Sequence, residues 1–230
     1  MIGIIGAMKD EVAQIISAME APAVSLIAGM EFYKGTIKGK ELVVVQSGIC
    51  KVNAGICTQI LADRFGADKV INTGIAGSLK KEINIGDLVL SVDALQHDVD
   101  AASFGYAPGV IPQMKTSCFE ADADLLGLAA RCNEAVNPEA QVHCGRVISG
   151  DQFISSREKK QWLADTFQGY CVEMEGAAIA QAAYLNQIPF LIVRAISDQA
   201  DDSAAMDYPS FEKLAIERSV RLLLAMISEL

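Results

Sequence analysis

Hydrophobic residues along the chain fall into two patterns, short continuous runs and longer stretches in which they recur at helical spacing. The runs are typical of buried strands, and the stretches predict helices with one buried face. Gly66 follows one helical stretch and Pro22 another, so each is expected to end a helix. Strands are expected at residues 2–6, 32–37, 41–46, 69–73, 88–94, 141–149, 170–172 and 189–196, and helices at about 9–19, 51–65, 121–135, 157–167, 173–185 and 209–230.

This alternation of strands and helices, without repeats or low-complexity linkers, predicts a single α/β domain over residues 1–230. A hairpin at Lys38-Gly39-Lys40 makes the expected sheet mixed rather than purely parallel. Residues 97–118 predict a long loop with apolar side chains that are unusual for a loop in solvent. We interpret three of them as a lid or a contact with a partner subunit: Phe104, Tyr106 and Pro112.

Composition narrows the class of protein. The chain is 51% hydrophobic, which indicates a well-filled core, and its formal charge of −10 argues against nucleic acid or an anionic membrane as a partner. Six cysteines never form Cys-x-x-Cys, a spacing typical of reduced thiols. No signal peptide is evident at the start, and no apolar run reaches the ~20 residues that span a bilayer. We therefore expect a cytoplasmic protein.

Carboxylates follow apolar segments at two places in the C-terminal third. Glu173 and Glu175 alternate with apolar neighbours, and Asp198 with Ser197 follows an apolar run that only Arg194 interrupts. Burying an unpaired carboxylate costs several kcal/mol, and strand ends are where open α/β proteins bind ligands. The pattern favours a functional site; the structural alternative is a set of capping residues with a core ion pair.

Other chemistries find little support. Gly3-x-x-Gly6 is half of a dinucleotide fingerprint, but acidic residues at positions 10 and 11 would repel a phosphate. His97 and the acids beside it lack a second histidine cluster that would complete a metal site, and Gly-x-Ser-x-Gly is absent. Gly74 and Gly77 at a strand end are interpreted either as a tight turn or as a place where backbone approaches a ligand.

Carboxylates therefore remain as candidate catalysts. Without metal or cysteine chemistry, they indicate general acid/base cleavage of a bond of the glycosidic type. The four candidates are Glu11, Glu173, Glu175 and Asp198.

Several segments together resemble one known family. The chain is similar, over essentially its whole length and in order, to the bacterial 5′-methylthioadenosine/S-adenosylhomocysteine nucleosidases. This resemblance implies a nucleoside phosphorylase-like fold with a central mixed, partly barrel-like sheet, a homodimer, and hydrolysis of the adenine–ribose bond without metal or cofactor. The segments that carry it are Gly3–Met8 with Glu11, Ser47–Lys51, Asn72–Gly74, Ser149–Ile154, Val172–Glu175 and Arg194–Asp198.

The resemblance also assigns roles by position. It implies that Glu11 activates water, that Asp198 with Ser197 protonates adenine N7, and that Glu175 binds the ribose hydroxyls. Phe153 would stack on adenine. Further substrate contacts are implied for Met8, Ile49, Gly77, Ile154, Met174, Arg194 and Tyr208, and for Phe104, Tyr106 and Pro112 of a neighbouring subunit.

Two points stay open. Ile75 stands where some members of the family carry serine, so a polar contact is lost there. A purine nucleoside or methylthioadenosine phosphorylase on the same fold remains an alternative, as does a non-catalytic nucleoside-binding module. Phosphorolysis needs arginine or backbone amides around a phosphate dianion, and the early loop offers only Lys9 beside two acids, which favours water as the nucleophile.

Overall fold

The computed structural model describes all 230 residues, and its strands join in one sheet. The strands are β1 (Ile2–Gly6), β2 (Glu20–Ile27), β3 (Met30–Ile37), β4 (Lys40–Gln46), β5 (Lys69–Ser78), β6 (Leu88–Gln96), β7 (Cys118–Glu120), β8 (Val142–Ser149), β9 (Cys171–Glu173) and β10 (Phe190–Asp198). The helices are α1 (Lys9–Ser17), α2 (Lys51–Phe65), α3 (Ala123–Val136), α4 (Arg157–Phe167), α5 (Gly176–Leu185) and α6 (Ala204–Glu229).

Five of the strands close into a ring. They follow one another in the order β10-β6-β8-β9-β5, and β5 pairs with β10 again. Pairings within the ring are both parallel, as between β5 and β10, and antiparallel, as between β6 and β10. The sheet is thus mixed and partly barrel-like, which confirms the expected fold class. The remaining path runs from β5 through β1, β4 and β3 to the edge strand β2.

Strand β2 was not predicted from the sequence. Its side chains are mostly exposed on both faces, so it lacks the apolar pattern that marks a half-buried strand. Pro22 lies within it rather than serving only to end helix α1, which already ends at Ser17. A proline is tolerated here because β2 is an edge strand and its register shifts between Glu20 and Ala23.

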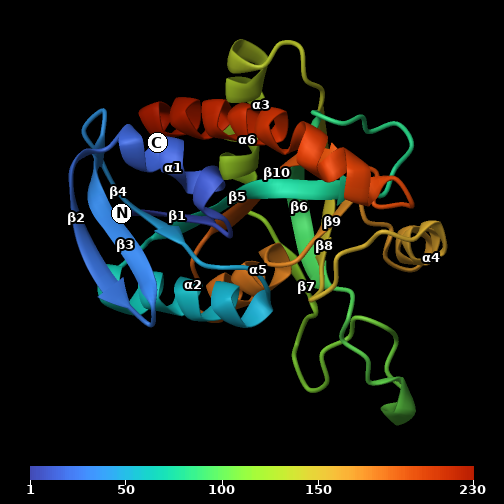
Figure 1. Ribbon diagram of the computed structural model, residues 1–230. Helices are drawn as coiled ribbons and strands as arrows, with labels where there is room; N and C mark the ends of the chain where they lie inside the picture. The colour runs from blue at the N-terminus through green and yellow to red at the C-terminus, as the bar shows by residue number, and fades with distance from the viewer.

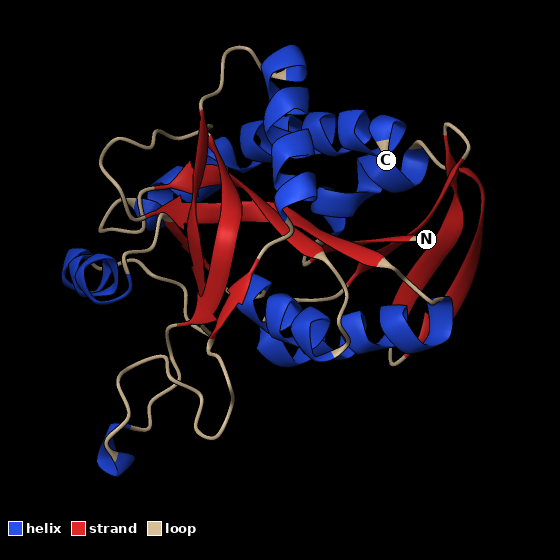
Figure 2. Cartoon of the chain, turned by 180° about the vertical axis from the view of Figure 1, so that it is seen from behind, coloured by secondary structure: helices blue, strands red, loops and turns tan.

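Helices cover the sheet on two sides. Helices α1, α3 and α6 pack in one layer and α2 with α5 in the other, with the strands between them (Figures 1 and 2). Each layer has its own apolar core, one built around Val12, Leu128 and Leu223 and one around Leu61 and Ile179. No helix combines the length and the apolar character needed to cross a membrane.

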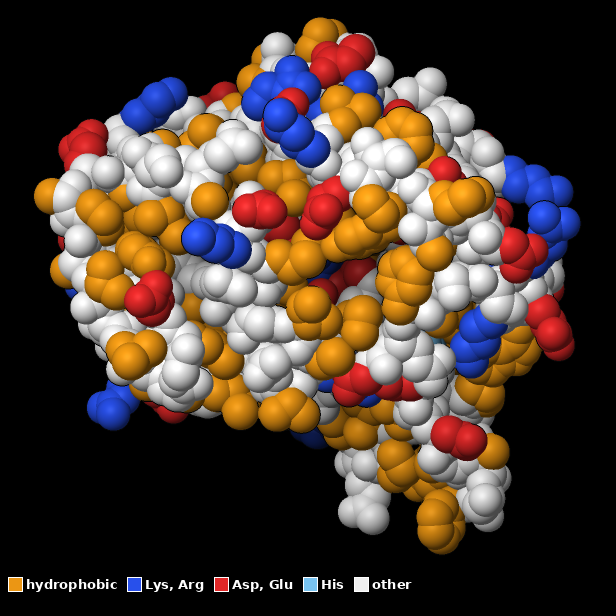
Figure 3. All heavy atoms as spheres, in the orientation of Figure 1, with side chains coloured by type: hydrophobic (Ala, Val, Ile, Leu, Met, Phe, Trp, Pro, Cys, Tyr) orange, Lys and Arg blue, Asp and Glu red, His pale blue; other side chains and the backbone are white.

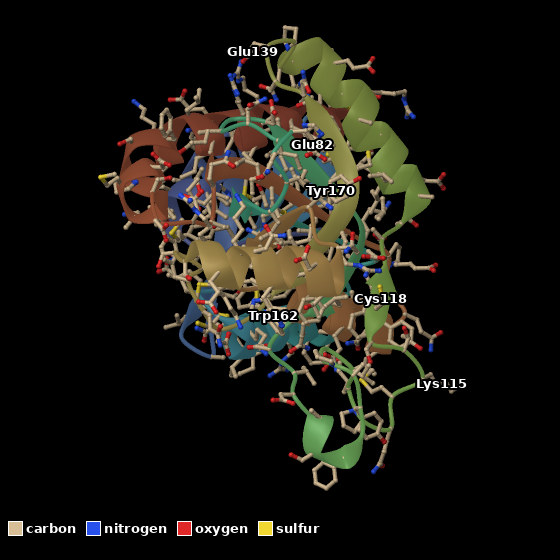
Figure 4. All side chains as sticks on the ribbon, turned by 90° about the vertical axis from the view of Figure 1, so that its right-hand side faces the viewer. Glu82, Lys115, Cys118, Glu139, Trp162 and Tyr170 are labelled. Atoms are coloured by element: carbon tan, nitrogen blue, oxygen red, sulfur yellow. The ribbon has the colours of Figure 1, made fainter.

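Two departures from the sequence prediction bear on the site. Helix α6 begins at Ala204 rather than at Pro209, which lies inside the helix. The extra turn and a half brings Tyr208 to the cavity described below. The long loop, predicted over residues 97–118, ends at residue 117 because Cys118 begins β7. It contains one 3-10 turn at Ala102–Phe104 and hangs away from the body of the molecule (Figures 1 and 4). In the side view Lys115 lies on the returning part of the loop and Cys118 where the chain rejoins the body.

Candidate active site

A cavity of about 460 Å³ opens at the carboxyl ends of β1, β5, β9 and β10. Seen on the molecular surface, the face between α2 and α6 is hollowed near its centre, where hydrophobic side chains surround acidic ones (Figure 3). The volume of the cavity suits a nucleoside-sized ligand. The structure brings together, as lining residues, all the candidates from this subunit except Arg194: Met8, Glu11, Ile49, Gly77, Phe153, Ile154, Met174, Glu175, Ser197, Asp198 and Tyr208.

Glu11 lies in the first turn of α1, only 3% exposed. One carboxylate oxygen accepts the backbone N–H of Met8 at 2.9 Å, and the other accepts that of Ile75 at 3.3 Å. Burial raises the pKa of Glu11, although nearby Arg194 and these amides partly offset it. The contact from position 75 comes from the backbone, so it does not depend on whether that residue is isoleucine or serine.

Asp198 is the last residue of β10 and is 3% exposed. The register of β10 against β5 shifts between Ile196 and Asp198, an irregularity of the kind that re-aims a side chain. One oxygen of Asp198 accepts the Ala200 N–H at 2.8 Å and the other accepts the Ser197 hydroxyl at 2.9 Å. Burial raises the pKa of Asp198 despite these two hydrogen bonds, so the carboxyl keeps its proton to a higher pH than usual.

Glu173 and Glu175 flank the buried guanidinium of Arg194. Arg194 donates to Glu173 and to the side-chain oxygen of Asn72, and its Nη2 lies 3.7 Å from Glu175. Glu173 also accepts the Ser149 hydroxyl and the backbone N–H groups of Glu175 and Gly176, where the positive end of the α5 dipole favours an anion.

Glu175 keeps one oxygen for the loop before α2, where it accepts the Cys50 N–H at 2.8 Å. Burial and the neighbouring Glu173 raise the pKa of Glu175, while Arg194 and the Cys50 amide act in the opposite direction. The positive charge of Arg194 thus acts on three carboxylates, because Glu11 also interacts with it electrostatically. Arg194 itself lies behind Glu173 and Glu175 and does not line the cavity.

Gly74 and Gly77 make room for neighbouring side chains, a role that differs from both sequence interpretations, a tight turn or a backbone approach to a ligand. Both lie within strand β5, so they form no turn. A Cβ at Gly74 would collide with the Arg194 guanidinium, and one at Gly77 would come within 2.8 Å of an Asp198 oxygen. The two glycines therefore leave room for the charged side chains of β10, which pairs with β5 in parallel.

The mouth of the cavity is apolar and less tightly packed. Phe153 is 51% exposed, and its ring meets that of Tyr208 edge-on with 6.0 Å between centroids. The Tyr208 hydroxyl lies 3.3 Å from the Met8 sulfur and 3.2 Å from Glu212. An exposed aromatic face at the mouth of a cavity suits stacking against a planar ring.

The three loop candidates do not reach this cavity. Phe104 is 84% exposed, and Tyr106 and Pro112 lie on the same projecting loop. The sequence left out Gln152 and Ala205, which line the cavity. Glu173 was a candidate catalyst without a specific role, and it both lines the cavity and binds Arg194. Glu173 had a signal in its spacing from Glu175, whereas Ala205 belongs to a helical turn that was not predicted.

The cavity is strongly acidic. Four carboxylates line it, and none of its nineteen lining residues is lysine, arginine or histidine. No group of three or more histidine, cysteine, aspartate and glutamate side chains is arranged to hold a metal ion. The arrangement can donate and accept protons and can stabilise positive charge on a bound ligand.

Comparisons with known proteins agree on one family. The model of the phosphorylase superfamily matches residues 1–228. The chain is 40% identical over 231 residues, 100% of both chains, to a 5′-methylthioadenosine/S-adenosylhomocysteine nucleosidase of Staphylococcus aureus.

Two solved structures of nucleosidases with the same name have closely similar folds. One, from Neisseria meningitidis in complex with methylthio-immucillin-A, superposes with a TM-score of 0.95 at 37% identity, covering 100% of this chain and 99% of that one. The other, from Colwellia psychrerythraea in complex with adenine, has a TM-score of 0.95 at 36% identity, covering 100% of this chain and 95% of that one.

Proposed function

Since the chain belongs to the phosphorylase superfamily and, within it, to the 5′-methylthioadenosine/S-adenosylhomocysteine nucleosidases, we propose that it hydrolyses the adenine–ribose bond of these two nucleosides. The products are adenine and a 5-thioribose compound. Such an enzyme serves methionine salvage and recycling of the methyl cycle. Residues 1–230 act as one nucleosidase domain in the cytoplasm.

The acidic lining of the cavity favours hydrolysis over phosphorolysis. A phosphate dianion needs arginine, lysine or a group of backbone amides to hold it. The lining residues offer four carboxylates and no cation, and the one buried arginine is already bound by Glu173 and Asn72. Neutral water can approach where phosphate would be repelled.

Asp198 supplies the acid. Adenine leaves poorly as an anion, so its N7 must gain a proton as the bond breaks. A carboxylic acid can donate near neutral pH only if its surroundings favour the protonated form, and burial raises the pKa of Asp198 in that direction. Ser197, which donates to Asp198, keeps the carboxyl oriented. Phe153 stacks on the adenine, and the backbone at Ile154 and Gly77 contacts its edge.

Glu11 and Glu175 act on the sugar. Glu11 takes a proton from the attacking water, for which its carboxylate is held by the Met8 and Ile75 amides. Glu175 binds the ribose hydroxyls, and its negative charge stabilises the ribosyl cation as it develops. Met174 packs against the sugar, and Arg194 acts indirectly, by fixing Glu173 and Glu175.

The 5′ substituent lies at the mouth, near Met8, Ile49 and Tyr208. Phe104, Tyr106 and Pro112 come from the long loop of the partner subunit and cover it, which makes the working enzyme a homodimer. The exposed hydrophobic side chains at the tip of that loop support this arrangement (Figure 3).

Adenine release from 5′-methylthioadenosine, measured with and without inorganic phosphate, tests the proposal. We expect the same rate in both conditions and a free reducing sugar as the second product. Release that requires phosphate and yields a sugar 1-phosphate would establish a phosphorylase instead. Tight binding without any release would establish a nucleoside-binding module.

A further inference from the structure

Two segments that border the cavity and a third that does not reach it meet at one side chain outside it. The segments are the loop Ser47–Cys50 before α2, residues 150–156 before α4, and the beginning of the long loop after β6. The side chain is that of Lys51, the first residue of α2, which does not line the cavity.

Lys51 binds the long loop through its ammonium group. The Nζ donates to Asp98 at 2.6 Å and to the side-chain oxygen of Gln96 at 2.9 Å, and Gln96 in turn donates to Gln181 of α5. The side chains of Lys51 and Asp98 are only 19% and 15% exposed. Burial opposes ionisation of Asp98, yet the hydrogen bonds from Lys51 and the Asp151 amide hold its pKa below the usual value.

Asp151 closes the network from the third segment. Its carboxylate accepts the backbone N–H of Lys51 at 2.9 Å, and its own N–H donates to Asp98 at 3.0 Å. These bonds lie close in sequence to two residues of the site. Cys50, whose N–H binds Glu175, precedes Lys51, and Phe153 follows Asp151 by two residues.

We propose that Lys51 and Asp98 are positioning residues of the active site, which hold the Cys50 amide on Glu175 and the Phe153 segment in register with the loop that serves the partner subunit. This inference rests on the proposed function, because it assigns the Glu175 and Phe153 contacts to ribose and adenine. The ribose-hydroxyl and adenine contacts bind substrate and transition state alike, and the charge of Glu175, which Lys51 does not touch, stays in place when they shift. Losing their alignment therefore raises KM more than it lowers kcat.

Kinetics of adenine release from 5′-methylthioadenosine test this inference in Lys51→Met, Lys51→Arg, Asp98→Asn and the Lys51→Met/Asp98→Asn double variant. We expect Lys51→Met to raise KM about tenfold with kcat within about threefold, and Lys51→Arg to recover part of the loss. The KM of the double variant should be no higher than that of the more impaired single variant, because both substitutions break the same hydrogen-bond network. Lys213→Met, which removes a lysine from an exposed pair with Glu217, is the matched control and should match the wild type.

Thermal unfolding of each variant separates positioning from plain stabilisation. A normal KM in Lys51→Met, with or without a lower Tm, would overturn the inference, as would additive effects in the double variant. If Lys51→Met does not fold, normal KM values in Lys51→Arg and Asp98→Asn overturn it instead, and raised values support it. A wild-type protein that releases no adenine would contradict the proposed function itself, and this result is distinct from normal kinetics in the variants.

Discussion

The floor and the rim of the cavity are built in different ways. The floor consists of Glu11, Glu173, Glu175 and Asp198, with Arg194 directly behind them. All five are less than 10% exposed and joined by hydrogen bonds to strands and helix ends. The rim consists of Ile49, Phe153 and Tyr208 with the proposed loop residues of the partner. Ile49 and Phe153 are exposed in one subunit, and Tyr208 is half-buried. The floor is therefore set before substrate arrives, whereas the rim is open to substrate and, in the proposed dimer, is covered by a second chain.

The largest expected effect comes from removing the two reacting acids of the floor. Glu11→Gln and Asp198→Asn should each lower kcat by about 10²–10⁴, since each removes one proton transfer while keeping the shape of the side chain. Adenine release under saturating substrate measures this. Asp10→Asn, an exposed neighbour on the same helical turn, is the control and should keep normal turnover. Near-normal kcat in either floor variant would remove that residue from its proposed role.

Arg194→Met tests whether the floor depends on its single cation. The substitution leaves buried carboxylates without their ion-pair partner, and we expect the free energy of unfolding to fall by about 3–5 kcal/mol. Chemical denaturation measures it. Arg157→Met provides the contrast, because that arginine is 80% exposed and 3.7 Å from Asp202, and we expect no measurable change. Equal losses in the two variants would contradict the distinction.

These two regions also differ in how far the sequence reveals them. Glu173, Glu175 and Asp198 were predicted because each follows an apolar segment, whereas Glu11 lies in a helix and was a candidate by elimination and by the family resemblance. Their connections were not, since the Arg194–Glu173 pair and the room left by Gly74 depend on which strands become neighbours. At the rim, the first turn of α6 was not predicted because a proline favours the start of a helix and Pro209 lies inside this one. Away from the cavity, β2 was not predicted because its exposed residues carry no periodic signal.

Phe104→Ala tests the rim. We expect KM for 5′-methylthioadenosine to rise about tenfold without loss of stability, because the side chain is exposed in its own subunit and is proposed to cover the neighbour's substrate. Leu26→Ala, at a 73% exposed apolar residue of β2, is the control. Sedimentation should give twice the chain mass of 24.5 kDa.

Mixing two variants sharpens this test. A dimer of one Glu11→Gln subunit and one Phe104→Ala subunit has a single pocket with both an intact floor and an intact covering loop. We expect that pocket to show the normal low KM. A mixture that keeps the high KM of Phe104→Ala would show that the loop does not act across subunits.

The pH dependence of the free energy of unfolding shows whether ionised Asp198 in the floor stabilises or destabilises the fold. Because the folded-state pKa of Asp198 is raised, its protonated form favours folding; this contribution is complete below the ordinary pKa and is lost as pH rises through the raised one. Asp198→Asn should therefore be more stable than the wild type at pH 7, by about 1 kcal/mol or ~2–4 °C in Tm. The difference should vanish near pH 4. Melting curves at both pH values measure it, and a less stable variant at pH 7 would contradict the raised pKa.

Cys50 follows Ile49 of the rim and binds Glu175 of the floor, and its substitution has the smallest expected effect on stability. Its backbone, at φ 80° and ψ 163°, lies in a region that is nearly restricted to glycine, while its N–H binds Glu175. Cys50→Gly should raise the free energy of unfolding by about 0.5–1 kcal/mol, since relief of strain exceeds the added freedom of glycine in the unfolded chain. KM should stay normal because the N–H remains. Cys144→Gly, in the regular strand β8, should be destabilised by about the same amount, so opposite signs in the two melting curves would locate the strain at Cys50.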